Sequence, residues 1–137
     1  MSWDLFVQDL PRDARTVDDI PDGFRPLPIG QRSDVIKAIQ AVVSEADFTD
    51  RSWGKIEGDG YSIEINLGDE EVLNSFAIHV YGGGRAPQVV AAILRRLGVR
   101  ALDPGSESGF FEAGASSQES FEKWQRFRNK VVGDDPV

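Results

Sequence analysis

His79, the only histidine of the chain, is the side chain best suited to acid–base chemistry near neutral pH. It lies in residues 75–81, and Glu64 lies in the preceding alternating run, residues 61–67. We expect these runs to pair as neighbouring strands that place His79 opposite Ser62 and diagonal to Glu64. A carboxylate there would orient the imidazole or hold it protonated, so His79 and Glu64 are candidate catalytic residues. The alternative is that both residues only belong to the polar face that an antiparallel sheet presents to water when helices cover its other face.

The same face of the predicted sheet carries candidates for binding a partner protein. Exposed aromatic residues are common interface anchors, and an acidic loop attracts a basic partner. The loop lacks the alternating ligands and the glycine of an EF-hand, so we expect a solvated or docking loop rather than a calcium site. The candidate partner-binding residues are Trp53, Lys55, Asn66, Asp69, Glu70, Glu71 and Tyr81.

A third candidate site is the run Gly82, Gly83, Gly84 and Arg85, which precedes a predicted helix. Backbone N–H groups at a helix start, together with an arginine, can bind an anion or a small phosphate-bearing ligand. The run lacks the lysine of a P-loop and the spacing of a dinucleotide fingerprint. The alternative is a turn whose glycines are needed for positive φ angles.

Composition excludes several classes of function. The chain has 137 residues, no cysteine and a net charge of -8. Residues 1–75 carry 16 acidic against 7 basic side chains, so the acidity belongs to this half. A protein this acidic repels nucleic acid, and without cysteine it has no thiol chemistry and few zinc ligands. We therefore predict no cofactor, no metal and no nucleic-acid partner.

The chain also contains no apolar run long enough to cross a membrane and no signal peptide at its first residues. These features predict a cytoplasmic protein without membrane association. The length predicts one domain over residues 1–137, with a frayed tail over 133–137.

Hydrophobic periodicity predicts the elements that position these sites. We expect an α+β fold: an antiparallel β-meander sheet with three helices packed mostly on one face, in the order β-α-β-β-β-α-β-α. The expected strands are 3–10 at or near a sheet edge, 52–57, 61–67, 75–81 and 99–102. The expected helices are 33–46, 87–97 and 117–132, and a long extended connection covers 11–32.

The centre of this sheet is a hairpin whose turn contains Asp59 and Gly60, a favoured two-residue turn sequence. The turn predicts four cross-strand pairs: Ile56 with Ile63, Gly54 with Ile65, Lys55 with Glu64, and Trp53 with Asn66. The inward side chains are then Ile56, Ile63, Ile65, Phe76, Ile78 and Val80.

The chain resembles a group of small uncharacterised bacterial proteins. The resemblance extends over nearly the whole chain and is carried by Ser2-Trp3-Asp4, Ile20-Pro21-Asp22, Trp53-Gly54, Ser62-Ile63-Glu64, Asn66-Leu67-Gly68-Asp69, His79-Val80 with the glycines that follow, and Leu97-Gly98 to Asp103. It implies a bacterial, cytosolic protein that is a monomer or a homodimer, and no particular activity. Many acidic α+β proteins of this size also look like immunity proteins that neutralise toxins, which is an analogy of fold alone.

Three functions follow from these observations. The first is a non-enzymatic protein-binding module, immunity- or adaptor-like, that presents an acidic surface to a basic partner. The second is a small-ligand or anion-binding domain at residues 82–85. The third is an enzyme that uses His79 and Glu64.

Overall fold

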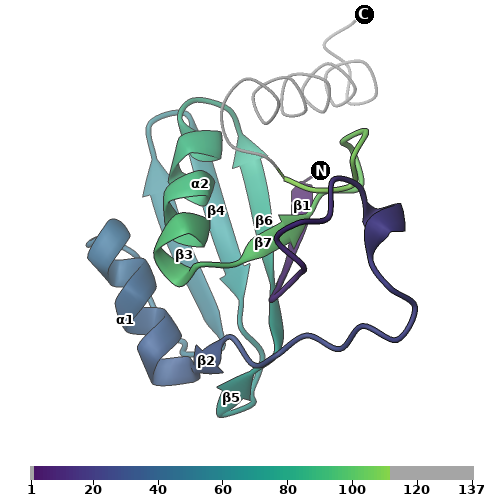
Figure 1. Ribbon diagram of the computed structural model, residues 1–137. Helices are drawn as coiled ribbons and strands as arrows, with labels where there is room; N and C mark the ends of the chain where they lie inside the picture. Colours follow the sequence, from purple (N-terminus) through teal and green to yellow (C-terminus); the bar gives the residue numbers. More distant parts are fainter. Residues whose placement is uncertain (1, 112–137) are drawn as a thin grey trace, which may run out of the picture.

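A computed structural model of the protein describes residues 2–111, and its centre is a five-stranded antiparallel sheet with the order β3-β4-β6-β1-β7 (Figure 1). The strands of this sheet are β1 (Trp3–Gln8), β3 (Trp53–Gly58), β4 (Tyr61–Asn66), β6 (Ser75–Gly82) and β7 (Arg100–Leu102). A separate two-stranded ribbon consists of β2 (Gly30–Gln31) and β5 (Val72–Leu73). The helices are α1 (Arg32–Val42), α2 (Ala86–Leu97) and the short 3-10 helix η1 (Val17–Asp19). This mixture of an antiparallel sheet and helices is the predicted α+β class.

The β3–β4 hairpin has the register that its turn sequence predicts. Ile56 lies opposite Ile63, Gly54 opposite Ile65, Lys55 opposite Glu64, and Trp53 opposite Asn66. Gly60 has a φ of 82°, which the tight turn requires and glycine adopts without strain. The alternation of apolar and polar residues and the Asp59-Gly60 turn therefore favour the same register.

The predicted register between β4 and β6 is wrong by two residues. Glu64 lies directly opposite His79, and Ser62 lies opposite Tyr81. The connection between these strands is not a tight turn but a longer excursion that contains β5, so no turn geometry sets the register. A shift of two residues leaves every side chain on the predicted face, because the strand repeat is also two.

Strand β1 is the second strand from one edge of the sheet, between β6 and β7. This position agrees with the prediction that residues 3–10 lie at or near a sheet edge. β7 pairs only with Phe6–Gln8 of this strand, from Phe6 opposite Leu102 to Gln8 opposite Arg100. The sheet is therefore a three-stranded meander, β3-β4-β6, extended by the first and last described strands of the chain.

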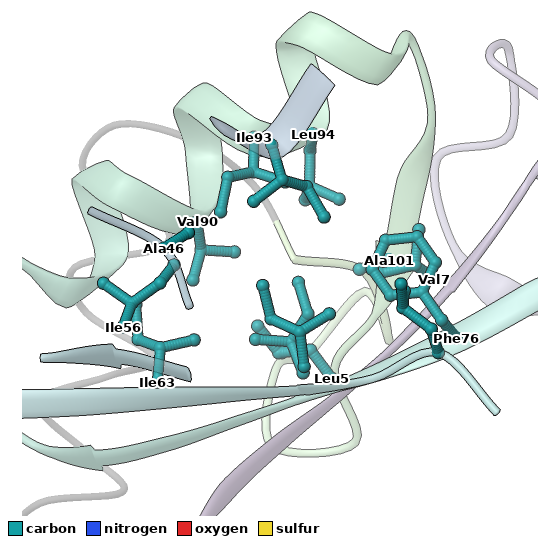
Figure 2. Close-up of a cluster of buried hydrophobic side chains, with 14 of the residues drawn as sticks. Leu5, Val7, Ala46, Ile56, Ile63, Phe76, Val90, Ile93, Leu94 and Ala101 are labelled. Atoms are coloured by element: carbon teal, nitrogen blue, oxygen red, sulfur yellow. The ribbon is translucent and has the colours of Figure 1, made fainter. Parts of the chain in front are cut away.

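Both α-helices contribute to one core on the inner face of the sheet. In Figure 2 side chains of α2, among them Val90, Ile93 and Leu94, extend toward Leu5 and Ile63 of the sheet. The inward residues of the prediction, from Ile56 to Val80, are all buried. Helix α2 ends as predicted at Gly98, which adopts the left-handed conformation with a φ of 69°.

Helix α1 is shorter than predicted, and its N-cap is Gln31 rather than Ser33.

The long connection between β1 and β2 folds back on the edge of the sheet. Its residues Leu10, Ala14, Ile20 and Phe24 form a second, smaller core with Phe110 and Leu102. The predicted helix 117–132 and the tail 133–137 lie outside the described residues.

Candidate functional site

The side chains that point away from α1 and α2 form a continuous surface over β1, β3, β4 and β6, here called the outer face. In the part of the chain that the structure describes, no helix packs on this surface (Figure 1). Its side chains are half-buried or exposed, in contrast to their inward neighbours. The outer face consists of Asp4, Phe6, Gln8, Trp53, Lys55, Glu57, Ser62, Glu64, Asn66, Ala77, His79 and Tyr81.

One row of polar residues crosses all four strands of the outer face. Lys55, Glu64, His79 and Asp4 are successive cross-strand partners on β3, β4, β6 and β1. The sequence prediction brings His79 and Glu64 together, and the structure makes them direct neighbours rather than diagonal ones. It adds Asp4, which the sequence reasoning did not include.

The contacts within this row give each carboxylate a different partner. His79 Nδ1 lies 2.7 Å from Asp4 Oδ1, and Trp53 Nε1 donates to Glu64 Oε1 at 2.7 Å. The Trp53 and His79 rings stack, with centroids 5.8 Å apart and planes 16° apart. Ser2 donates a further hydrogen bond to Asp4. Because Asp4 rather than Glu64 contacts the imidazole, Asp4 is the carboxylate placed to orient His79.

Catalysis by His79 and Glu64 stays a prediction. The His79 side chain is 21% exposed and that of Asp4 is 43% exposed, so both are accessible to a solute. Neither His79 nor Glu64 lines the hollow that lies beside the polar row on the outer face.

A hollow of about 310 Å³ lies on the outer face beside the polar row. Ala77 lies between Asn66 and Phe6 in the cross-strand register, and its small side chain leaves the space open. The Phe6 side chain is 43% exposed although large aromatic residues are usually covered. The hollow is lined by Phe6, Gln8, Asn66, Leu67, Gly68, Ser75, Phe76 and Ala77.

Sequence reasoning missed Phe6, Gln8 and Ser75 as site residues. The signal for Phe6 was present, because the inward alternation of Trp3, Leu5 and Val7 directs Phe6 to the opposite face. No local signal places Gln8 beside Ser75, since that proximity arises from the pairing of β1 with β6.

Acidic loops lie at the end of the sheet where the hollow is. The Ser52 carbonyl accepts hydrogen bonds from the N–H groups of Leu67 and Gly68, which joins the loop before β3 to the loop after β4. The Ser52 hydroxyl, followed by its N–H, lowers the pKa of the Asp50 carboxyl below its ordinary value. The Thr49 side chain, followed by its N–H, likewise lowers the pKa of the Asp47 carboxyl.

The predicted docking loop, residues 69–71, contains two kinds of carboxylate. Glu71 forms an ion pair with Arg32 at 3.1 Å, and the same guanidinium donates to the Gly68 carbonyl at 3.1 Å. Asp69 and Glu70 are exposed, and neither belongs to an ion pair within residues 2–111. Asp69 and Glu70 are therefore the carboxylates of this loop that no cation pairs with among residues 2–111.

The glycine run lies at the opposite end of β6 and packs on the β3–β4 turn. A Cβ at Gly82 would lie 2.5 Å from the Gly60 carbonyl oxygen, and one at Gly84 would lie 2.7 Å from that of Asp59. Gly83 N–H donates to the same Gly60 oxygen at 2.8 Å. This close packing accounts for the glycines without a ligand, and anion binding by Gly82 to Arg85 stays a prediction.

The predicted partner-binding residues thus fall into one connected region. Trp53, Lys55, Asn66 and Tyr81 share the outer face, and residues 69–71 border one end of it.

Within residues 2–111 no three His, Cys, Asp or Glu side chains gather as metal ligands. No helix of the described region has the length and apolar character needed to cross a bilayer. Comparisons of the chain with protein-family models, curated proteins and solved structures find no match.

Proposed function

We propose that this protein is a non-enzymatic protein-binding module, immunity- or adaptor-like, that binds a basic partner with its outer face and the acidic loops at one end. The observation that supports the proposal most is the hollow beside the exposed Phe6 ring, at the end of the sheet where Asp50 and Asp69 lie. An aromatic anchor next to an open hollow is typical of the energetic centre of a protein interface.

The electrostatic arrangement supports a basic partner in particular. Hydrogen bonds from Thr49 and Ser52 keep the Asp47 and Asp50 carboxyls ionised to a lower pH than ordinary aspartates. Asp69 and Glu70 add exposed negative charge in the loop that the Ser52 carbonyl joins to the Asp50 loop, whereas Asp47 pairs with Lys55 along the edge of β3. A fixed negative field of this kind raises the rate of association with a positively charged surface.

The test uses the full-length chain as bait in a lysate of its native cells, at low and at moderate salt. We expect capture of a specific basic protein, whose affinity is then measured with purified components. The double variant Asp69→Lys/Glu70→Lys should weaken binding by about tenfold or more, because two attractive charges become repulsive. Glu71 is left unchanged because it holds Arg32.

The matched control is Asp22→Lys/Glu107→Lys, which reverses two exposed carboxylates that lie in other loops. We expect its affinity to stay within about twofold of the wild-type value, since distant surface charges are largely screened. Equal losses in both double variants, no specific partner, or a partner that ignores the loop charges would refute the proposal.

A further inference from the structure

The lining of the hollow is neutral but rich in hydrogen-bonding groups. Asn66 and Phe6 flank Ala77 in the register, and Gln8 lies opposite Ser75 in the next row. The lining therefore combines an aromatic ring and a methyl group with two amides and a hydroxyl. No charged residue lines it within the described residues. The Asn66 Oδ1 already accepts a hydrogen bond from Gly68 N–H at 3.2 Å. A purely apolar occupant would leave the Gln8 amide and the Ser75 hydroxyl without water partners, which is costly.

Negative charge surrounds this neutral hollow. Asp9 follows the lining residue Gln8, and Asp69 follows the lining residue Gly68. Glu64 lies two residues before Asn66 on the same face of β4.

Arg100 and Arg32, two arginines that adjoin the lining, are engaged elsewhere. Arg100 lies opposite Gln8, but its guanidinium donates to the carbonyls of Pro11 and Ala14. Arg32 binds Glu71 and the carbonyl of Gly68. The field at the hollow therefore favours a cationic occupant.

We propose that the hollow receives an arginine side chain of the basic partner, with its guanidinium against the Phe6 ring. This inference rests on the proposed function and names the group that the partner inserts. A guanidinium is planar and weakly hydrated, stacks on aromatic rings, and carries five donors for amide and hydroxyl oxygens. The protein already contains this arrangement once, because the Arg100 guanidinium lies 3.7 Å from the centroid of the Phe110 ring.

Lysine fits the hollow less well than arginine. Its ammonium is compact and strongly hydrated, and it needs a carboxylate to replace the water that it loses. The carboxylates lie around the hollow and not in its lining. The proposal therefore predicts discrimination between two side chains of equal charge.

The first test is an NMR titration of the full-length chain with the amides of N-acetylarginine, N-acetyllysine, N-acetylcitrulline and N-acetylleucine. We expect the arginine probe to bind in the millimolar range and to shift the backbone amides of Phe6, Asn66 and Ala77 most. Citrulline matches arginine in shape without the charge, so equal shifts from it would overturn the proposal. Equal or stronger binding of the lysine or leucine probe, or no shifts at these residues, would also overturn it.

Variants of the hollow provide the second test. Ala77→Leu fills the space and should abolish the shifts caused by the arginine probe. Ala41→Leu adds a similar side chain at an exposed position of α1, away from the outer face, and should leave them unchanged. Phe6→Ala removes the stacking ring and should weaken binding even if Ala77→Leu perturbs the strand, which a melting curve of each variant will show.

The captured partner separates this inference from the proposed function. A partner that requires Asp69 and Glu70 but binds Ala77→Leu as tightly as wild type refutes the arginine hollow and leaves the proposed function intact. A partner that is indifferent to the loop charges refutes the proposed function itself. We expect about a tenfold loss of affinity for Ala77→Leu and no more than about a twofold loss for Ala41→Leu.

Discussion

At the residue scale, the hydrogen bonds of the outer face give similar side chains different environments. Asp4 contacts the imidazole of His79, whereas Glu64 accepts from the indole of Trp53. These contacts and the stacking of the two rings hold Trp53 in a defined position beside the polar row. An aromatic side chain that is already ordered loses less conformational entropy when a partner binds.

The Asp50 carboxyl offers a direct test of the acidic loops. Ser52→Ala removes the hydroxyl that is the largest cause of the lowered pKa of Asp50, so this pKa should rise toward its ordinary value. A carboxyl ¹³C NMR titration measures the change. Asp47 is the internal control, because the lowering of its pKa comes first from Thr49 and should persist. A pKa of Asp50 that stays unchanged in Ser52→Ala would contradict this account of the loop.

The same hydrogen bonds make a pH-dependent contribution to stability. A carboxyl whose pKa is lower in the folded than in the unfolded protein stabilises the fold above the unfolded pKa. This contribution disappears as the pH falls through the folded pKa, when the carboxyl takes up a proton. The stability difference between wild type and Ser52→Ala should therefore narrow in acid, as chemical denaturation at several pH values will show.

At the scale of elements, the loop before α2 is defined by its contact with the β3–β4 turn. Gly82 and Gly84 have φ angles of 85° and 62°, and both face backbone carbonyls of the turn. These glycines therefore combine a left-handed conformation with a close approach that leaves no room for a side chain.

Gly82→Ala should consequently destabilise the protein by about 2 kcal/mol or more, since alanine is strained at this φ and its Cβ meets the Gly60 oxygen. Gly23→Ala is the matched control, because no atom lies within 4 Å of a Cβ at that position. We expect the control to lie within about 0.5 kcal/mol of wild type or to be slightly more stable. Urea denaturation measures both, and equal stabilities for the two variants would show that the loop does not require its packed conformation.

The pairing of β4 with β6 shows where local patterns stop being informative. The alternation of residues 75–81 correctly predicts that Phe76, Ile78 and Val80 are buried. It does not distinguish registers that differ by two residues, because these bury the same side chains. The cross-strand pairing of Glu64 with His79 therefore depends on long-range packing rather than on a turn.

At the scale of the whole molecule, a hydrogen bond between two distant segments joins β1 to the turn that follows β7. Trp3 Nε1 donates to Asp103 Oδ1 at 3.0 Å, and both residues are buried. Asp103 Oδ1 also accepts from Gly105 N–H at 3.0 Å. A buried carboxylate is expensive unless it is hydrogen-bonded, so these contacts are needed to keep Asp103 in the interior.

Trp3→Phe should therefore destabilise the protein by about 2 kcal/mol or more, through a lost charged hydrogen bond and a small cavity. Trp53→Phe makes the same chemical change on the half-exposed outer face, where water can replace the indole as a partner of Glu64. We expect it to cost about 1 kcal/mol or less. Equal losses of unfolding free energy for the two variants in urea denaturation would contradict the larger contribution of the Trp3–Asp103 hydrogen bond to stability.

Taken alone, the sequence determined the features that depend on neighbours along the chain. Alternation within residues 61–67, the turn at Asp59 and Gly60, and the end of α2 at Gly98 each follow from local chemistry, and all are present. The inward and outward sets of the central strands follow from the same two-residue repeat. The acidity of residues 1–75 is likewise a property of composition.

Only the tertiary structure decided which outward residues meet. The short ribbon of β2 and β5 joins segments that are about forty residues apart in the chain, and two-residue strands carry no periodic signal. The contact of Asp4 with His79 and the hollow among Phe6, Asn66 and Ala77 both require β1 to pair with β6. That pairing is stabilised by a shared core contributed from all parts of the described chain, and no single segment encodes it.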